Sequence, residues 1–177
     1  MPLKPQDILI ALKLHQHRDD TPTYAQLASE LELSAAEVHA ATKRLIQARI
    51  AEPKLEQRSL PSIKIKALEE FIVHGLKYAF YAERGELTRG VPTAHAAQPL
   101  KRLIAPTDEP PPVWPDPNGK TRGYAFEPLY RSVPSIAKRD PELYELLALI
   151  DAIRDGRARE RELAKRAISE RLHRVKA

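Results

Sequence analysis

Apolar residues recur at helical spacing near both ends of the chain, and polar residues separate the periodic stretches. In the first stretch Ile8, Leu9 and Leu12 share one helical face, and Pro5 and Asp7 suit a first turn. The pattern predicts three helices and a short hairpin over residues 3–60, a longer amphipathic helix over Ser62–Tyr81, and two helices in tandem over residues 140–175.

Two helix-start signals lie eleven residues apart in the N-terminal part. Thr23 begins Thr-Tyr-Ala-Gln and Ser34 begins Ser-Ala-Ala-Glu, so each hydroxyl can cap a first turn while Gln26 or Glu37 reaches back to the cap amide. This spacing predicts a helix, a tight turn and a second helix. In such an arrangement the N-terminal half of the second helix can enter the major groove of DNA. The apolar residues expected to fix the crossing of the two helices are Leu27, Leu31, Val38 and Leu45.

The outward face of the second helix is small and polar at its tip, which lets a helix approach base edges closely. Residues Ile50–Arg58 leave room for the strands and tip of a wing, whose cations Lys54 and Arg58 could reach phosphates. The residues predicted to bind DNA are Thr23, Tyr24, Ser34, Ala35, His39, Lys43, Arg44, Lys54 and Arg58.

This region resembles the winged helix-turn-helix regulators of the MarR-like and related bacterial families. The matching stretches are Tyr24-Ala25-Gln26-Leu27-Ala28, Leu33-Ser34-Ala35-Ala36-Glu37-Val38 and Lys43-Arg44-Leu45-Ile46-Gln47-Ala48-Arg49-Ile50. The resemblance covers about a third of the chain and implies a winged helix that reads operator DNA. The chain departs from the family pattern at His39-Ala40, where these regulators often have Ser-Arg, and at Thr42, where they usually have Leu.

Residues 82–139 are rich in proline, which excludes long helices over most of this segment. Trp114, Tyr124, Phe126 and Tyr130 supply bulk for a core, and Asp116-Pro117-Asn118-Gly119 has turn chemistry with Asn-Gly able to take positive φ. A short hairpin around Val113–Phe126 and an ordered loop are both compatible with this composition. Four polar residues could line a pocket for an anionic effector, although scattered loop residues are usually only solvated: Arg84, Arg89, Thr93 and His95.

The C-terminal helices begin at Asp140-Pro141-Glu142, a cap followed by an N1 proline and an acid, and Gly156 interrupts them. They invite two interpretations, a self-pairing interface of a homodimer or packing inside the chain against Ser62–Tyr81. The apolar stripe of the first of these helices consists of Leu143, Leu146, Leu147, Ile150 and Ile153.

Composition and charge narrow the function classes. The 177 residues carry a formal net charge of +5 and no cysteine, which excludes disulfides, thiol catalysis and Cys-type zinc sites. Residues 1–60 hold 8 Lys and Arg against 8 Asp and Glu, whereas residues 154–177 hold 9 against 4. No secretory signal, membrane-spanning apolar run, phosphate-binding glycine loop or metal-ligand set is visible, and His15-x-His17 lacks a third ligand. We therefore expect a cytoplasmic protein that is not an enzyme and needs no cofactor.

The sequence thus predicts a mainly α fold, with an N-terminal winged helix-turn-helix and a helical, Pro-rich C-terminal extension. The expected parts are a DNA-binding domain at 1–60, a connecting helix at 61–81, an irregular segment at 82–139 and a helical pair at 140–177. The predicted function is a sequence-specific regulator of transcription, a repressor, that binds double-stranded DNA as a homodimer. The alternative is an adaptor or antitoxin-like partner whose winged helix binds another protein.

Overall fold

The computed structural model describes residues 1–176 and divides into two compact units. Unit 1 comprises Met1–Glu70, and unit 2 begins at Phe71. The division falls inside the predicted connecting helix 61–81, so the DNA-binding domain predicted at 1–60 is shorter than the unit that contains it. Each unit has its own buried core.

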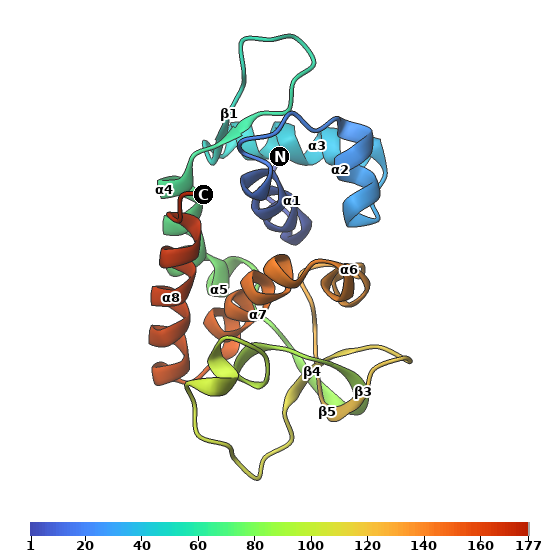
Figure 1. The fold of residues 1–177 in the computed structure, drawn as a ribbon, viewed down its shortest axis with the longest axis vertical. Coiled ribbons are helices and arrows are strands. Elements are labelled where there is room, and N and C mark those ends of the chain that lie inside the picture. The colour runs from blue at the N-terminus through green and yellow to red at the C-terminus, as the bar shows by residue number, and fades with distance from the viewer. Residues whose placement is uncertain (177) are drawn as a thin grey trace. The chain divides into compact units, whose positions relative to one another are not determined.

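Unit 1 is built on three helices that the local sequence signals predict well (Figure 1): α1 Pro5–Gln16, α2 Tyr24–Leu31 and α3 Ala35–Gln47. The Ser34 hydroxyl accepts a hydrogen bond from the Glu37 amide at 3.1 Å, and the Glu37 carboxylate accepts one from the Ser34 amide at 2.9 Å. This confirms the predicted capping box of α3. Thr23 caps α2 through the Gln26 amide, but the Gln26 side chain donates to Glu30 instead of reaching back.

The turn between α2 and α3 is made by Glu32, whose φ of 55° is left-handed. It ends α2 and brings the two helices together at an angle that buries their inner faces. The side chains predicted to fill this core are buried, including Ile8, Leu9, Leu12, Leu27, Leu31, Val38 and Leu45.

A two-stranded antiparallel ladder follows the three helices. Strands β1 Ala51–Glu52 and β2 Ser62–Ile63 have two residues each, and the segment 53–61 between them contains no strand. Pro53 and Pro61 flank that segment and cannot donate to a longer ladder. The three helices are therefore not followed by a clear wing.

The helix predicted over Ser62–Tyr81 is shorter and irregular. Its first two residues form β2, and the helical part consists of α4 Ile65–Glu70, a π-helical turn η1 at Phe71–Gly75, and α5 Leu76–Ala79. Leu68, Ile72 and Leu76 are buried along it.

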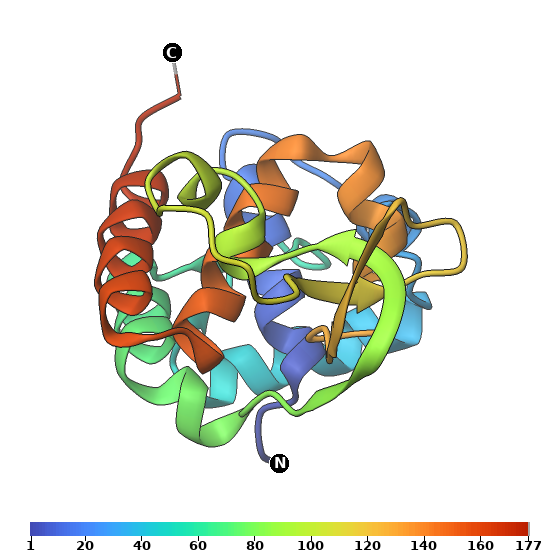
Figure 2. The same ribbon diagram turned by 90° about the horizontal axis from the view of Figure 1, so that it is seen from below.

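Unit 2 contains a small sheet of three strands that closes on itself: β3 Arg84–Pro92, β4 Pro112–Pro115 and β5 Thr121–Phe126. Both β4 and β5 pair antiparallel with β3, which is strongly curved (Figure 2), and they run parallel to each other. The hairpin predicted over Val113–Phe126 is therefore wrong, because its two strands are not antiparallel partners.

The chain between β4 and β5 crosses closely over Gly90. Gly90 is the partner of Pro115 in β4 and of Thr121 in β5, so the connection starts and ends at the same point of β3. A Cβ on Gly119 would lie 2.4 Å from the Gly90 backbone. Gly119 does not have positive φ, so its glycine is required by this close approach and not by the turn geometry predicted for Asn-Gly.

Helices pack around this sheet. The 3₁₀ turns η2 Ala94–Ala96 and η3 Leu100–Arg102 follow β3, and α6 Val133–Arg139 leads into the C-terminal pair α7 Pro141–Asp155 and α8 Ala158–Leu172. The Asp140 carboxylate caps α7 through the Leu143 amide at 3.0 Å, and the helices separate at Gly156, as predicted. The apolar stripe of α7 is buried inside unit 2, where it contacts α5, α6 and α8.

The predicted fold class is wrong. The chain is mixed α/β, because two small sheets accompany the helices and one of them occupies the segment predicted to be irregular. The proline content of residues 82–139 as a whole led to the wrong prediction, although Arg84–Val91, which forms most of β3, contains no proline. None of the helices within residues 1–176 has the length and apolar character that crossing a bilayer requires.

Candidate functional site

The exposed face of α3 carries three predicted site residues in one stripe. Ala35, His39 and Lys43 follow one another at intervals of four residues, and all three are exposed. Residues four apart lie on the same helix face. Val38 and Leu45 on the opposite face are fully buried, so α3 presents this stripe outward while its other side is fixed in the core.

An aromatic stack joins the stripe to the start of α2. The rings of Tyr24 and His39 lie 3.7 Å apart between centroids and are nearly parallel, with an interplanar angle of 7°. Tyr24 is half-buried and His39 is exposed. The stack restricts the rotamers of the His39 imidazole, which would otherwise move freely on a helix surface.

The N-terminus of α2 and the segment between β1 and β2 line a common cleft of about 300 Å³. Thr23 and Tyr24 contribute from the first element, and Lys54 and Arg58 from the second. The first turn of a helix has unpaired amides and a partial positive charge, which favours anions. The cleft thus brings four of the predicted DNA-binding residues together, although Glu56 also lines it.

Arg44, in contrast, is not available to a ligand. Its guanidinium is buried, and it donates two hydrogen bonds to the carboxylate of Asp7 at 2.8 and 2.7 Å. These hydrogen bonds raise the pKa of Arg44. The prediction of Arg44 as a DNA-binding residue is therefore wrong, because it ties α3 to the first turn of α1.

A second polar cluster in unit 1 surrounds Glu30. Its carboxylate contacts His17 Nε2 at 2.7 Å and Lys13 Nζ at 3.5 Å. Burial opposes the ionisation of Glu30, but the hydrogen bond with His17 and the charge of Lys13 outweigh it and lower the pKa. His17 also contacts Asp20, whereas His15 is buried, so the two histidines of His15-x-His17 lie in different surroundings.

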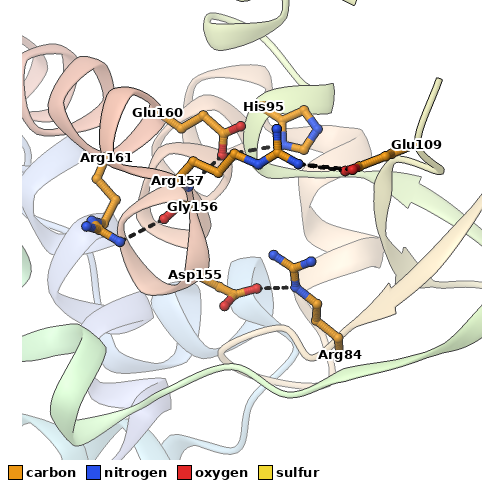
Figure 3. A network of polar contacts seen from close by, with 8 residues as sticks. All are labelled: Arg84, His95, Glu109, Asp155, Gly156, Arg157, Glu160 and Arg161. Atoms are coloured by element: carbon orange, nitrogen blue, oxygen red, sulfur yellow. Dashed lines mark hydrogen bonds and ion pairs between the residues drawn. The ribbon is translucent and has the colours of Figure 1, made fainter. Parts of the chain in front are cut away.

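Unit 2 contains a narrow polar cleft lined by two of the four predicted effector residues, Arg84 and His95 (Figure 3). Arg84 donates to Asp155 at 2.6 Å, and His95 lies 3.8 Å from Glu160. Arg157 donates to both carboxylate oxygens of Glu109 at 3.1 and 2.9 Å. Every cation seen at this cleft in Figure 3 has a carboxylate or carbonyl partner.

The geometry of this cleft limits what it can accept. Its volume is about 30 Å³, room for a very small number of water molecules. The Arg84 guanidinium lies 4.9 Å from the centroid of the Tyr124 ring, and burial raises the pKa of the Tyr124 hydroxyl. An effector would have to displace existing ion pairs, so the predicted effector site stays a prediction.

The other two predicted effector residues are elsewhere. Thr93 is buried, and its hydroxyl donates to Asp151 at 2.7 Å. Arg89 is exposed on β3 and does not line the cleft. Thr93 therefore has a structural partner, and the predicted group of four does not converge.

Asp151 is the centre of a buried network that the sequence interpretation missed. It accepts hydrogen bonds from Thr93, from Trp114 Nε1 at 2.7 Å and from Arg154 at 2.9 Å. Arg154 also donates to the carbonyl oxygens of Phe80 and Glu127. Burial raises the pKa of Asp151, and the three donors oppose this shift. The network connects α7 to β4, to the chain just before β3 and to the chain just after β5. An acid inside the apolar stripe of α7 was the available signal.

Comparisons with protein-family models, with curated protein sequences and with solved structures find no match to this chain. The resemblance of residues 3–60 to bacterial regulators stays a prediction.

Proposed function

We propose that unit 1 binds double-stranded DNA and that the protein regulates transcription through this contact. The observation that carries the proposal is the stripe on α3, flanked by the cleft that joins Thr23 and Tyr24 to Lys54 and Arg58. A small, polar helix face beside a cationic cleft suits a duplex, since the helix can meet base edges while the cations meet phosphates.

Each part has a distinct expected role. Ala35, at the start of α3, lets the helix backbone approach the floor of the major groove. His39, held by Tyr24, is the side chain that would contact a base edge. Lys43, Lys54 and Arg58 would neutralise phosphates, and the cap residues Thr23 and Ser34 would offer hydroxyls and helix amides to the backbone.

The balanced charge of residues 1–60 is compatible with this role because several acids are used within the unit. Asp7 is neutralised by Arg44, Glu30 by Lys13 and His17, and Glu37 caps α3. Lys43, Lys54 and Arg58 make no ion pair within residues 1–176. The free cations of unit 1 thus include Lys43 in the α3 stripe and Lys54 and Arg58 in the cleft.

A salt titration tests the proposal. Binding of the full chain to a labelled duplex from upstream of its own gene is followed by fluorescence anisotropy. Lys43→Ala should reduce the slope of log Kobs against log salt by about 0.9, the value expected for one phosphate contact. Lys66→Ala, which removes an exposed lysine from α4, is the matched control and should leave the slope unchanged. Absence of duplex binding at low salt refutes the proposal.

Sequence preference tests the role of the aromatic stack. His39→Ala should change the sequences recovered by selection from a randomised duplex library, because it removes the proposed base contact. Tyr24→Phe keeps the ring and should preserve the preference, whereas Tyr24→Ala frees the imidazole and should broaden it. If all three variants select the same sequences as the wild type, His39 does not contact a base as proposed.

The homodimer is a separate expectation with less support. The apolar stripe predicted to pair two copies is buried within unit 2. Light scattering at micromolar concentration would measure the mass directly. A monomeric mass would contradict the homodimer but would not affect the proposed contact of unit 1 with DNA.

An adaptor role through unit 2, and not through the predicted winged helix, has one observation in its favour. Tyr78 and Tyr81 of unit 2 are 74% and 66% exposed, and aromatic side chains of this kind are common at protein interfaces. Tyr78→Ser and Tyr81→Ser should weaken binding of a partner protein encoded beside the gene if this alternative holds, without changing duplex binding.

A further inference from the structure

Two arginines of unit 2 lie side by side on neighbouring strands of the sheet. Arg89 on β3 is the direct antiparallel partner of Arg122 on β5. Directly opposite residues project to the same side of a sheet, with Cα atoms about 4.5–5.5 Å apart. Lys120, an exposed residue directly before β5, adds a third cation two residues from Arg122 along the chain. We call Arg89, Lys120 and Arg122 the β3–β5 cation face.

This face is open to solvent, whereas the other side of the same strands is covered. A Cβ on Gly90 would lie 2.0 Å from the Trp114 oxygen, and one on Gly123 would lie 1.9 Å from the Pro111 oxygen. The chain of β4 therefore lies against the side to which Gly90 and Gly123 point. Since side chains alternate along a strand, Arg89 and Arg122 point away from β4. Both are exposed.

No carboxylate neutralises the pair within residues 1–176. Four other arginines of unit 2 have acidic partners: Arg84 with Asp155, Arg157 with Glu109, Arg154 with Asp151 and Arg171 with Glu145. Within residues 1–176, Arg89, Lys120 and Arg122 form no ion pair or hydrogen bond through their side chains. Like charges placed directly opposite each other destabilise a sheet. The fold therefore holds an unfavourable arrangement that an external polyanion would relieve.

We propose that the β3–β5 cation face binds the phosphate backbone of duplex DNA. Guanidinium groups match phosphate oxygens in paired hydrogen bonds, and two of them fixed about 5 Å apart at their bases can hold one phosphate or two successive ones. Duplex DNA presents one charge per about 3.4 Å along each strand, so neighbouring phosphates lie within reach of both side chains. This contact gives unit 2 a role in DNA binding that is independent of the α3 stripe.

The competing occupant is an acidic protein surface. Leu87, which is 51% exposed, lies two residues before Arg89 on the same side and could serve such a partner. Leu87 lies opposite Tyr124, however, whose ring already contacts the Arg84 guanidinium and is less available as a buried anchor for a partner protein. Phosphate contacts need only exposed cations, which favours DNA.

The test compares two variants of the full chain that lose the same charge from the same unit. Arg89→Gln with Arg122→Gln removes the proposed contact, and Lys101→Gln with Arg102→Gln removes two exposed cations of η3 as the control. Binding to a labelled duplex of mixed sequence is measured between about 50 and 200 mM salt. In the first variant the slope of log Kobs against log salt should become shallower by about 1.8, since two phosphate contacts are lost. Over this fourfold range of salt, the increase in affinity at the lower concentration should therefore be about 12-fold smaller than in the wild type. The control should keep the full slope.

The outcomes separate this proposal from the function proposed for unit 1. An unchanged slope in the Arg89/Arg122 variant beside a reduced slope for Lys43→Ala overturns the cation face alone. A reduced slope only in the Arg89/Arg122 variant supports the cation face and contradicts the α3 contact. Loss of binding to poly-glutamate with unchanged binding to DNA identifies an acidic protein and also overturns the proposal. Arg89→Lys with Arg122→Lys retains the charge and should restore most of the slope, while unchanged Trp114 fluorescence shows that unit 2 is folded.

Discussion

Arg44 was predicted from the sequence to bind DNA. Because it forms a buried ion pair with Asp7, we predict that it contributes to the stability of unit 1 instead. Arg44→Met removes the guanidinium but keeps a flexible apolar side chain of similar length. Asp7 is then left fully buried with its charge, and the amide of Lys4 remains as its donor. The variant should lose stability in unit 1 before it loses any direct contact with DNA.

The magnitude follows from the burial of both partners. The side chains of Arg44 and Asp7 are 5% and 0% exposed, and removal of one member of a buried pair costs about 3–5 kcal/mol. At 1.4 kcal/mol per factor of ten, this corresponds to an increase of roughly two to nearly four orders of magnitude in the population of opened unit 1. Asp7→Asn combined with Arg44→Met removes the stranded charge and should recover part of the loss.

Hydrogen exchange measured by mass spectrometry is the suitable assay because it follows peptides of α1 and α3 separately from unit 2. Amides of both helices should exchange faster in Arg44→Met by the factor given above. Lys43→Met, which removes the adjacent exposed cation, should leave exchange unchanged. Wild-type exchange in Arg44→Met together with a reduced salt slope for DNA would refute the reasoning and return Arg44 to the DNA-binding residues.

Two further predictions concern the sheet of unit 2 and the Glu30 cluster. Gly90→Ala should destabilise unit 2 by at least about 1–3 kcal/mol, because its Cβ would overlap the Trp114 backbone oxygen. The fluorescence of Trp114, the single tryptophan, reports that unfolding in urea, and an unshifted midpoint would contradict the close packing. Glu30 has a lowered pKa in the folded state, so its contribution to stability is present above about pH 4.5, its ordinary value, and is lost as the pH falls through the folded-state value. Glu30→Gln should therefore reduce the protection of α2 at neutral pH but not in strong acid, and an equal difference at both pH values would argue against the ion pair.

Local signals predicted the helices because helix starts are encoded within a few residues. The Ser34–Glu37 capping box and the Asp140 cap of α7 each depend on atoms three residues apart, and both form as predicted. The burial of Val38 and Leu45 follows in the same way from the 3.6-residue period. Ala35, His39 and Lys43 lie on the opposite helix face from these buried residues, so the same period predicts that they point outward.

Features that depend on distant residues were missed. Arg44 looks like a surface cation until Asp7, 37 residues away, is placed beside it. Strand β3 lacks the apolar alternation of an ordinary strand, since Gly90 faces inward and Arg89 outward. A strand whose inner side touches backbone instead of apolar side chains leaves no hydrophobic period in the sequence. Hydrophobic periodicity and turn chemistry therefore could not predict that β4 and β5 both pair with β3.

If unit 1 binds DNA as proposed, the burial of α7 also bears on the kind of site that is recognised. Leu146, Leu147 and Ile150 of α7 pack inside their own unit and are not left to join a second copy. If light scattering shows a monomer, the protein reads a single asymmetric element, and inverted repeats are not required in its target. Reversing such an element relative to the promoter would then turn the bound protein around, and the effect on transcription would depend on the orientation of the element.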